Sequence, residues 1–353
     1  MEKPATYVVG LDVHKYLHVT CIMDRHDTIR ARLTFPNTRP GLEQLLAAMR
    51  KLGRKSSFLI GMEASGPYWF SLYEHLKQET FRVVTINPLQ TRKRSKEDIR
   101  VAKTDRLDAR RIAQILLHGE NRPTLVPSPK AMTLRQLLRT RHALVQKKGD
   151  LKRLLLAQLH PVWPEYETLF CNPFIATSRQ ILESARNAFT CTALLDAAEQ
   201  TIPQLIRQID TMDQERATLE ETILTYADKL PTWLDLPGLG PLMALTIWAE
   251  TDPIKTFNRP RKLVAFAGLD LTIGKSGQGP YAKRKLSKRG SPYLRYALYM
   301  AAESVRKHAP DIMKYYDRLR NEGFHHIAAT CCVARKLCYV LWRLAQDNRK
   351  YKP

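Results

Sequence analysis

The first part of the chain, up to about residue 120, alternates short β-branched apolar runs with segments whose apolar residues recur every three or four positions. The apolar runs predict strands, and the three-to-four-residue period predicts helices. Strands are expected at residues 7–13, 17–23, 29–35, 58–62 and 82–86. Helices are expected from Pro40-Gly41 onward, over residues 69–76, and around Asp105 and Asp108.

This order of elements indicates a fold class for the first part of the chain. Three meandering strands followed by helix, strand, helix, strand and helix is the order of the ribonuclease-H-like fold, a mixed sheet with helices. We therefore expect an α/β domain over residues 1–122. Such an analogy concerns the fold alone and establishes no activity.

The middle of the chain is predicted to be helical. Pro123, Pro127 and Pro129 interrupt the pattern and mark a linker. Apolar residues then recur at helical spacing over 132–159, where Pro161 and Pro164 are expected to end the helix, and again over 205–227. The two stretches suit an antiparallel helical hairpin or an intermolecular coiled coil, and the pattern does not choose between them. They define an expected connector over residues 130–230.

The last part, residues 231–353, is predicted to be a mostly helical domain. Its Leu236–Leu245 segment contains a Pro-Gly-x-Gly turn that leads into an apolar helix, similar to a helix-hairpin-helix element. Glycines there would let the backbone approach a phosphate, and the helix N-terminus offers free N–H groups. The alternative is an ordinary pair of core helices. Residues 294–305 and 328–344 are expected to form further amphipathic helices.

The charge balance points to a polyanionic partner. The chain carries 57 Lys and Arg against 34 Asp and Glu, a formal net charge of +23. A surface this basic favours nucleic acid, because neutralised phosphates release counterions. A membrane surface is less suitable, since no apolar run approaches the ~20 residues of a spanning helix and the first residues lack the apolar stretch of a signal peptide. We therefore expect a cytoplasmic protein with no membrane partner.

Four carboxylates are candidates for a metal site. Asp12 lies near the end of the first strand, Glu63 follows the fourth, and Asp105 and Asp108 are three residues apart on a helix and so share a face. In a ribonuclease-H-like sheet the first and fourth strands are neighbours and the last helix crosses beside them. Four converging carboxylates would repel one another unless cations screened them, which predicts a site for Mg²⁺, or for Mn²⁺, of the two-metal phosphodiesterase type. The alternative for each acid alone is a cap or first-turn residue.

The motifs around these acids resemble those of a known family. The segments Gly10-Leu11-Asp12-Val13-His14-Lys15, Met62–Tyr68 and Lys103–Ala109 look like the Asp-Glu-Asp-Asp motifs of insertion-sequence-110 family transposases, which join a RuvC-like domain to a C-terminal transposase domain and include the Piv-type DNA invertases. The segments Leu236–Gly240, Phe266–Leu269, Lys275–Gly277 and Arg295–Ala302 resemble the C-terminal signature in the same order.

The resemblance implies a second catalytic group, a serine nucleophile, and Ser276 is the matching position. Glycines at 274 and 277 would let a phosphate come close, and Lys255–Arg295 contains eleven Lys and Arg against the single acid Asp270. Such a segment would favour the charge that builds on a phosphoryl group. Ser287 and Ser291 are weaker candidates because they follow the basic run. Basic side chains expected to contact nucleic acid are Arg92, Lys93, Arg94, Lys96, Lys275, Lys283, Arg284, Lys285, Lys288 and Arg289.

Taken together, these features predict an enzyme that cleaves and exchanges DNA strands through a phosphoserine intermediate. The resemblance implies a homo-oligomer, dimer or tetramer, in which the carboxylates of one subunit work with the serine of another. It also implies a noncoding guide RNA, encoded by the element, that pairs with donor and target DNA. Selection of the DNA sequence by base pairing would suit a chain without an obvious base-reading module. Two alternatives remain open: a hydrolytic Holliday-junction resolvase using the carboxylates alone, and a non-catalytic nucleic-acid-binding protein.

Overall fold

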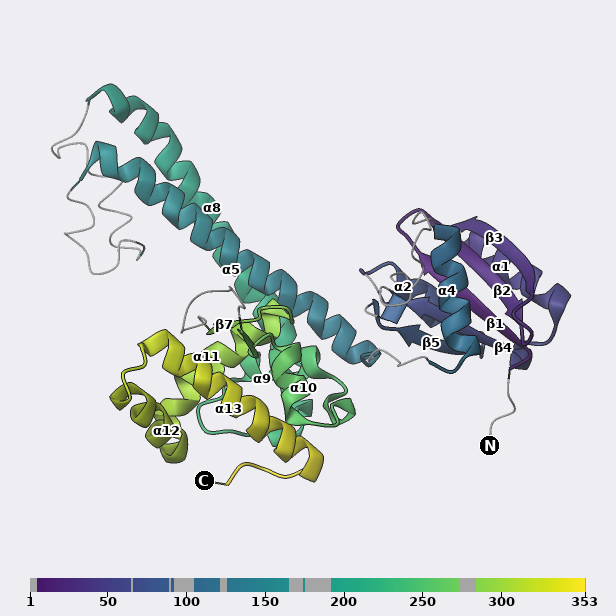
Figure 1. The fold of residues 1–353 in the computed structure, drawn as a ribbon. Helices are drawn as coiled ribbons and strands as arrows, with labels where there is room; N and C mark the ends of the chain where they lie inside the picture. Colours follow the sequence, from purple (N-terminus) through teal and green to yellow (C-terminus); the bar gives the residue numbers. More distant parts are fainter. Residues whose placement is uncertain are drawn as a thin grey trace, which may run out of the picture. The chain divides into compact units, whose positions relative to one another are not determined.

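The chain folds into two compact units, Met1–Val126 and Pro127–Pro353 (Figure 1). The computed structural model describes residues 5–64, 66–88, 90–91, 105–120, 126–164, 174, 192–273 and 284–352. The boundary between the units falls within the expected proline-rich linker. The finer division into a connector over 130–230 and a transposase domain over 231–353 stays a prediction.

The first unit contains the five predicted strands, in one mixed sheet. They are β1 (Tyr7–Val13), β2 (Leu17–Asp24), β3 (Ile29–Pro36), β4 (Phe58–Glu63) and β5 (Arg82–Ile86). The order across the sheet is β3-β2-β1-β4-β5. The pairs β1–β2 and β2–β3 are antiparallel, whereas β1–β4 and β4–β5 are parallel. This is the ribonuclease-H-like order that the sequence predicted.

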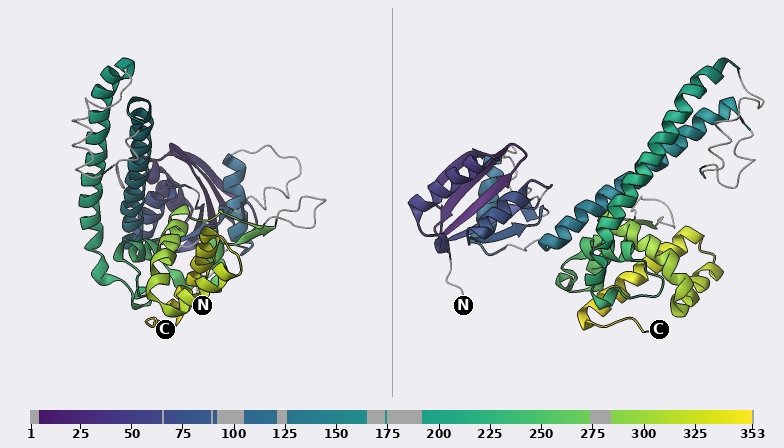
Figure 2. Two further views of the ribbon diagram at one scale, coloured as in Figure 1. Left: turned by 90° about the vertical axis from the view of Figure 1, so that its left-hand side faces the viewer. Right: turned by 180° about the vertical axis from the view of Figure 1, so that it is seen from behind.

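Helices cover both faces of the sheet (Figure 2). On one face, α1 (Arg39–Leu52) and α2 (Trp69–Gln78) pack on a core that includes Val9 and Leu11. A short 3-10 turn, η1 (Lys55–Ser57), follows α1. On the other face, α4 (Asp105–Leu117) packs on a core that includes Val8 and Cys21. Residues of β1 therefore alternate between the two cores, as the pleat of a central strand requires.

The second unit begins with a long antiparallel pair, α5 (Pro129–Val162) and α8 (Thr192–Leu224). Leu155 and Leu159 of α5 pack with Ile209 of α8 at one end, and Leu134 packs with Ile223 at the other. The two predicted helical stretches thus pair as a hairpin within one chain. The first helix ends between the two prolines that were expected to stop it: α5 includes Pro161 in its last turn, and Trp163, just after it, donates its N–H to the carbonyl of Leu159.

The rest of the second unit is mostly helical, as predicted. Its elements are the 3-10 turns η2 (Ala227–Lys229), η3 (Thr232–Leu234) and η4 (Ile254–Thr256), the helices α9 (Pro241–Thr251), α10 (Pro260–Phe266), α11 (Pro292–His308), α12 (Pro310–Asn321) and α13 (His326–Asp347), and the antiparallel strands β6 (Leu271–Ile273) and β7 (Arg284–Leu286). Gly238 forms the turn before α9 with a φ of +80°. The segment before this turn consists of the short 3-10 turns η2 and η3 and not of a long helix. The expected contact of α9 with nucleic acid stays a prediction. No helix in the described part of the chain has both the length and the apolar composition needed to cross a bilayer.

Candidate active site

Asp12 and Glu63 lie at or next to the ends of neighbouring parallel strands, on the same face of the sheet. Leu11 of β1 pairs with Met62 of β4, so Asp12 and Glu63 occupy the next positions in the two strands. Side chains alternate along a strand, and Leu11 and Met62 both belong to the core under α1 and α2. Asp12 and Glu63 therefore project toward the opposite face, which α4 covers.

Two paired glycines bring α4 close to this face. Gly10 of β1 lies opposite Gly61 of β4. A Cβ atom on Gly10 would lie 2.0 Å from the carbonyl oxygen of Ala109, and one on Gly61 would lie 2.7 Å from a methyl carbon of Leu116. At Gly10 the contact is with the backbone of α4, so only hydrogen there permits the observed approach, which places the start of α4 beside the end of β1.

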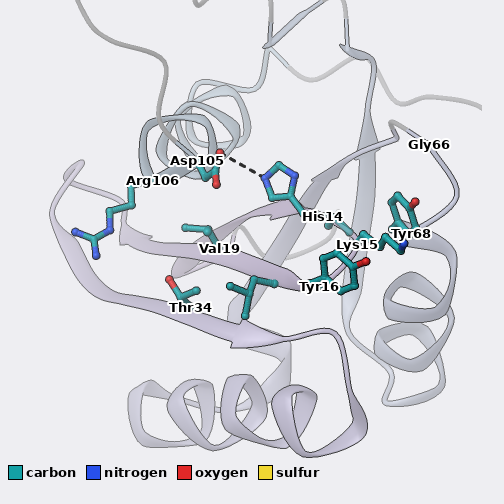
Figure 3. A pocket seen from close by; sticks show the side chains of 11 residues that line it. His14, Lys15, Tyr16, Val19, Thr34, Gly66, Tyr68, Asp105 and Arg106 are labelled. Carbon is teal, nitrogen blue, oxygen red and sulfur yellow. Dashed lines mark ion pairs between the residues drawn. The ribbon is translucent and has the colours of Figure 1, made fainter.

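The first turn of α4 carries Asp105, and a single histidine, His14, contacts both Asp105 and Asp12. The Nε2 atom of His14, just beyond β1, lies 3.1 Å from Asp12 Oδ2 and 3.6 Å from Asp105 Oδ1. Figure 3 shows His14 and Asp105 facing each other at the edge of a cavity of about 990 Å³, which Tyr68, Thr34 and Arg106 also line. His14 belongs to the first acidic motif of the sequence but is not among the predicted site residues; its position two residues after Asp12 was the available signal.

The other two predicted carboxylates have their own partners. Asp108 accepts a hydrogen bond of 2.7 Å from the guanidinium of Arg111, one turn further along α4. Glu63 accepts a hydrogen bond of 2.6 Å from the hydroxyl of Thr91. The structure thus brings Asp12, Asp105 and His14 within ligand distance of one another, and it holds Asp108 and Glu63 in hydrogen bonds beside them. Thr91 was missed by the sequence analysis, because a contact across 28 positions leaves no local pattern.

The environment of Asp12 disfavours its charged form. The pKa of Asp12 is raised from its ordinary 3.8 to about 6, mainly by burial and to a smaller extent by the nearby carboxylates of Asp108 and Asp105. The contact with His14 acts in the opposite direction, because a positive imidazole stabilises the carboxylate. A cation placed among these groups would relieve both the burial cost and the mutual repulsion.

The donor set suits a divalent metal ion. Asp12, His14 and Asp105 each offer one ligand atom, and these atoms all lie within 4.8 Å of one another. Carboxylate oxygens are preferred ligands of Mg²⁺ and Mn²⁺, and an imidazole nitrogen suits transition metals.

The predicted serine lies outside the described residues, between the ends of the β6–β7 hairpin. Ile273 pairs with Arg284, and Ser276 belongs to the segment that joins them. The two weaker candidates have structural partners. Ser287 bonds to Asp270, and Ser291 caps α11 by accepting the N–H of Leu294 at 3.2 Å.

The predicted nucleic-acid contacts are only partly described. Lys285, Lys288 and Arg289 follow the start of β7 and are exposed, and the backbone of Arg284 begins that strand. Outside the described residues lie Arg92, Lys93, Arg94, Lys96, Lys275 and Lys283.

Fold and site together define a ribonuclease-H-like domain with a carboxylate cluster at its strand ends, joined to a helical second unit. Two family models match the chain, "Transposase" over residues 9–164 and "Transposase IS116/IS110/IS902 family" over residues 233–317. The chain belongs to this insertion-sequence-110 family of transposases.

Individual relatives agree with this assignment. The chain is 23% identical to a "Probable family 20 transposase" of Pseudomonas aeruginosa, over 98% of both chains. It is 22% identical to the "Pilin gene-inverting protein" of Moraxella bovis, over 98% of this chain and 97% of the relative. It is 28% identical to the "Insertion element IS116 uncharacterized 44.8 kDa protein" of Streptomyces clavuligerus, but over only 42% of this chain and 37% of that relative's length.

Proposed function

We propose that this chain is an insertion-sequence transposase that cleaves and exchanges DNA strands in a metal-dependent reaction through a covalent link to Ser276. The observation that carries the proposal is the meeting of Asp12 and Asp105 with His14 at the strand ends of a ribonuclease-H-like sheet. Matches to transposase models in both parts of the chain support it, as does a relative named for inverting a pilin gene.

In this proposal the carboxylates prepare a phosphodiester for attack. Asp12 and Asp105 would hold Mg²⁺ or Mn²⁺, with Glu63 and Asp108 completing the site. Bound metal would stabilise the charge on the attacking and leaving oxygens. The hydrogen bonds from Thr91 to Glu63 and from Arg111 to Asp108 fix the two further carboxylates in direction.

The serine would conserve the energy of the broken bond. Its Oγ forms a bond to phosphorus and loses its proton, while the bond from phosphorus to one deoxyribose oxygen breaks and that oxygen takes a proton. A hydroxyl of another strand then reverses the step and releases the serine. Strands can therefore rejoin without a high-energy cofactor.

The proposed partners are DNA, both the element ends and the target, and an element-encoded noncoding RNA that selects them by pairing. The net charge of +23 supports binding to these polyanions. We further propose a homo-oligomer in which the carboxylates of one subunit serve the serine of another. Mixing Ser276→Ala protein with Asp12→Ala protein should then restore part of the activity that each lacks, and no restoration would argue for a site within one subunit.

A cleavage assay with labelled DNA and the element's RNA tests the metal site. Asp12→Asn and Asp105→Asn should each abolish strand cleavage and leave nucleic-acid binding intact or slightly tighter, because a negative charge is lost. Glu43→Gln provides a matched control: Glu43 is an exposed acid of the same unit on α1, paired only loosely with Arg50 at 3.4 Å. Cleavage that persists in a chelator, or in Asp105→Asn, would rule out the proposed metal site and show that other groups cleave the strand.

A further inference from the structure

Among the described residues, His14 is the only nitrogen donor in the Asp12–Asp105 cluster, and it contacts acids from two separate elements. Asp12 belongs to β1 and Asp105 to α4, and the same imidazole atom, Nε2, reaches both. A histidine that served only to orient Asp12 would need one of these contacts. A position between two carboxylates is instead that of a third donor around a common centre.

The two distances from His14 are close to those between neighbouring ligands of one metal ion. In an octahedral site with bonds of about 2.1 Å, neighbouring ligand atoms lie about 3.0 Å apart. The separations of 3.1 Å to Asp12 and 3.6 Å to Asp105 are close to this spacing, the second slightly wider. A small closure of the exposed side chains of His14 and Asp105, 46% and 62% accessible, would complete the arrangement.

We propose that His14 binds the divalent cation directly through Nε2, beside Asp12 and Asp105, and that this nitrogen donor gives the site a preference for Mn²⁺ over Mg²⁺. This inference rests on the proposed function, because it assigns a ligand to the same metal. The preference follows from the donor type: an imidazole nitrogen suits transition metals, whereas Mg²⁺ strongly favours oxygen.

The competing role for His14 is that of a counterion. In that case a protonated imidazole neutralises Asp12 and Asp105 in the metal-free protein and moves away when the cation binds. The two roles differ in one observable: only a ligand places a nitrogen nucleus within bonding distance of the metal.

Pulsed electron paramagnetic resonance of Mn²⁺ bound to the full-length, tag-free protein separates the two roles. The wild-type protein should show ¹⁴N modulation from a bound imidazole. His14→Ala should lose this signal and bind Mn²⁺ at least about tenfold more weakly, with a smaller loss for Mg²⁺. His14→Asp should keep metal binding without the nitrogen signal, because it replaces the imidazole by an oxygen donor.

His26→Ala is the matched control. His26 is an exposed histidine of the same unit, in the turn between β2 and β3, and its removal should leave both the ¹⁴N signal and the Mn²⁺ affinity unchanged. His14 is itself half-exposed, so its replacement should not prevent folding, and a circular dichroism melt of each variant verifies this.

Several results would overturn the inference. They are the absence of ¹⁴N modulation in the wild type, its persistence in His14→Ala, an unchanged Mn²⁺ affinity in that variant, or no binding of Mn²⁺ at all. Wild-type protein that needs Mg²⁺ for cleavage but shows no ¹⁴N signal would leave the proposed function standing and assign His14 the counterion role. Cleavage without any metal would instead remove the proposed function.

Discussion

Replacing Gly10 by alanine tests whether the close approach of α4 to β1 builds the active site. The new Cβ atom would lie 2.0 Å from the carbonyl oxygen of Ala109 and 2.5 Å from the amide nitrogen of Ala113. Both are backbone atoms of α4, so rotation of a side chain cannot relieve the contact. The helix must retreat by about 1.5 Å to reach an ordinary van der Waals separation.

The expected cost has two parts. Overpacking of this kind destabilises a fold by about 1–3 kcal/mol, and a clash with backbone places Gly10→Ala at or above the upper end of that range. Because Asp105 and Asp108 lie on the helix that moves, the site also opens. A displacement of about 1 Å at a catalytic centre lowers the rate on the order of 100-fold.

Gly61→Ala is the matched comparison on the neighbouring strand. Its Cβ atom would meet Leu116 at 2.7 Å and Ile86 at 3.2 Å, and both contacts are to side-chain atoms, which can shift more easily than the backbone of α4. We therefore expect a smaller loss of stability and a largely retained cleavage rate. Urea unfolding and the strand-cleavage assay measure the two effects. Equal stability and activity of Gly10→Ala and wild type would refute the reasoning, and so would a greater loss in Gly61→Ala than in Gly10→Ala.

Three further predictions concern other parts of the chain. Thr91→Val removes the hydroxyl that orients Glu63 and should lower the cleavage rate about tenfold without weakening DNA binding; an unchanged rate would mean that this bond has no catalytic role. Glu250→Ala removes the buried acid that Arg139 binds through two nitrogens, at 2.8 and 3.0 Å. It should lower the free energy of unfolding by an amount near the low end of about 3–5 kcal/mol, because Arg139 is partly exposed. A change below about 1 kcal/mol by urea titration would contradict this expectation. Affinity for duplex DNA should fall with salt along a log–log slope of about 0.9 per phosphate contacted, and a flat dependence would exclude backbone neutralisation as the main source of binding.

The strands of the first unit could be predicted because their local signals agree with the final fold. Residues 7–13 and 82–86 are short β-branched runs, and the structure places strands at those positions. Their order in space followed from a known arrangement of elements rather than from the pattern itself. The long helices were also predicted, but whether they pair within one chain depended on contacts such as Lys148 with Asp213, which sequence periodicity does not encode.

The candidate site was predicted less completely than the fold. Asp12 was identified from its position near the end of a strand, and Asp105 from its position in a helix with a second acid three residues on. Their approach depends on Gly10, because a side chain there would collide with the backbone of α4. That requirement can be seen only once the position of α4 is known. The contacts of His14 and Thr91 are fixed by the three-dimensional packing of separate elements, so the sequence alone could not rank these residues above ordinary polar positions.

The most direct test of the account is a search for DNA covalently attached to the protein. The full-length chain is incubated with element-derived RNA, labelled DNA and Mg²⁺, denatured, and resolved by electrophoresis beside Ser276→Ala and Ser287→Ala. The account predicts a labelled protein band for the wild type and for Ser287→Ala, and none for Ser276→Ala, which should still bind RNA and DNA. Cleaved DNA with no attached protein, or an adduct that survives in Ser276→Ala, would contradict the central claim; the first result would point to a hydrolytic resolvase.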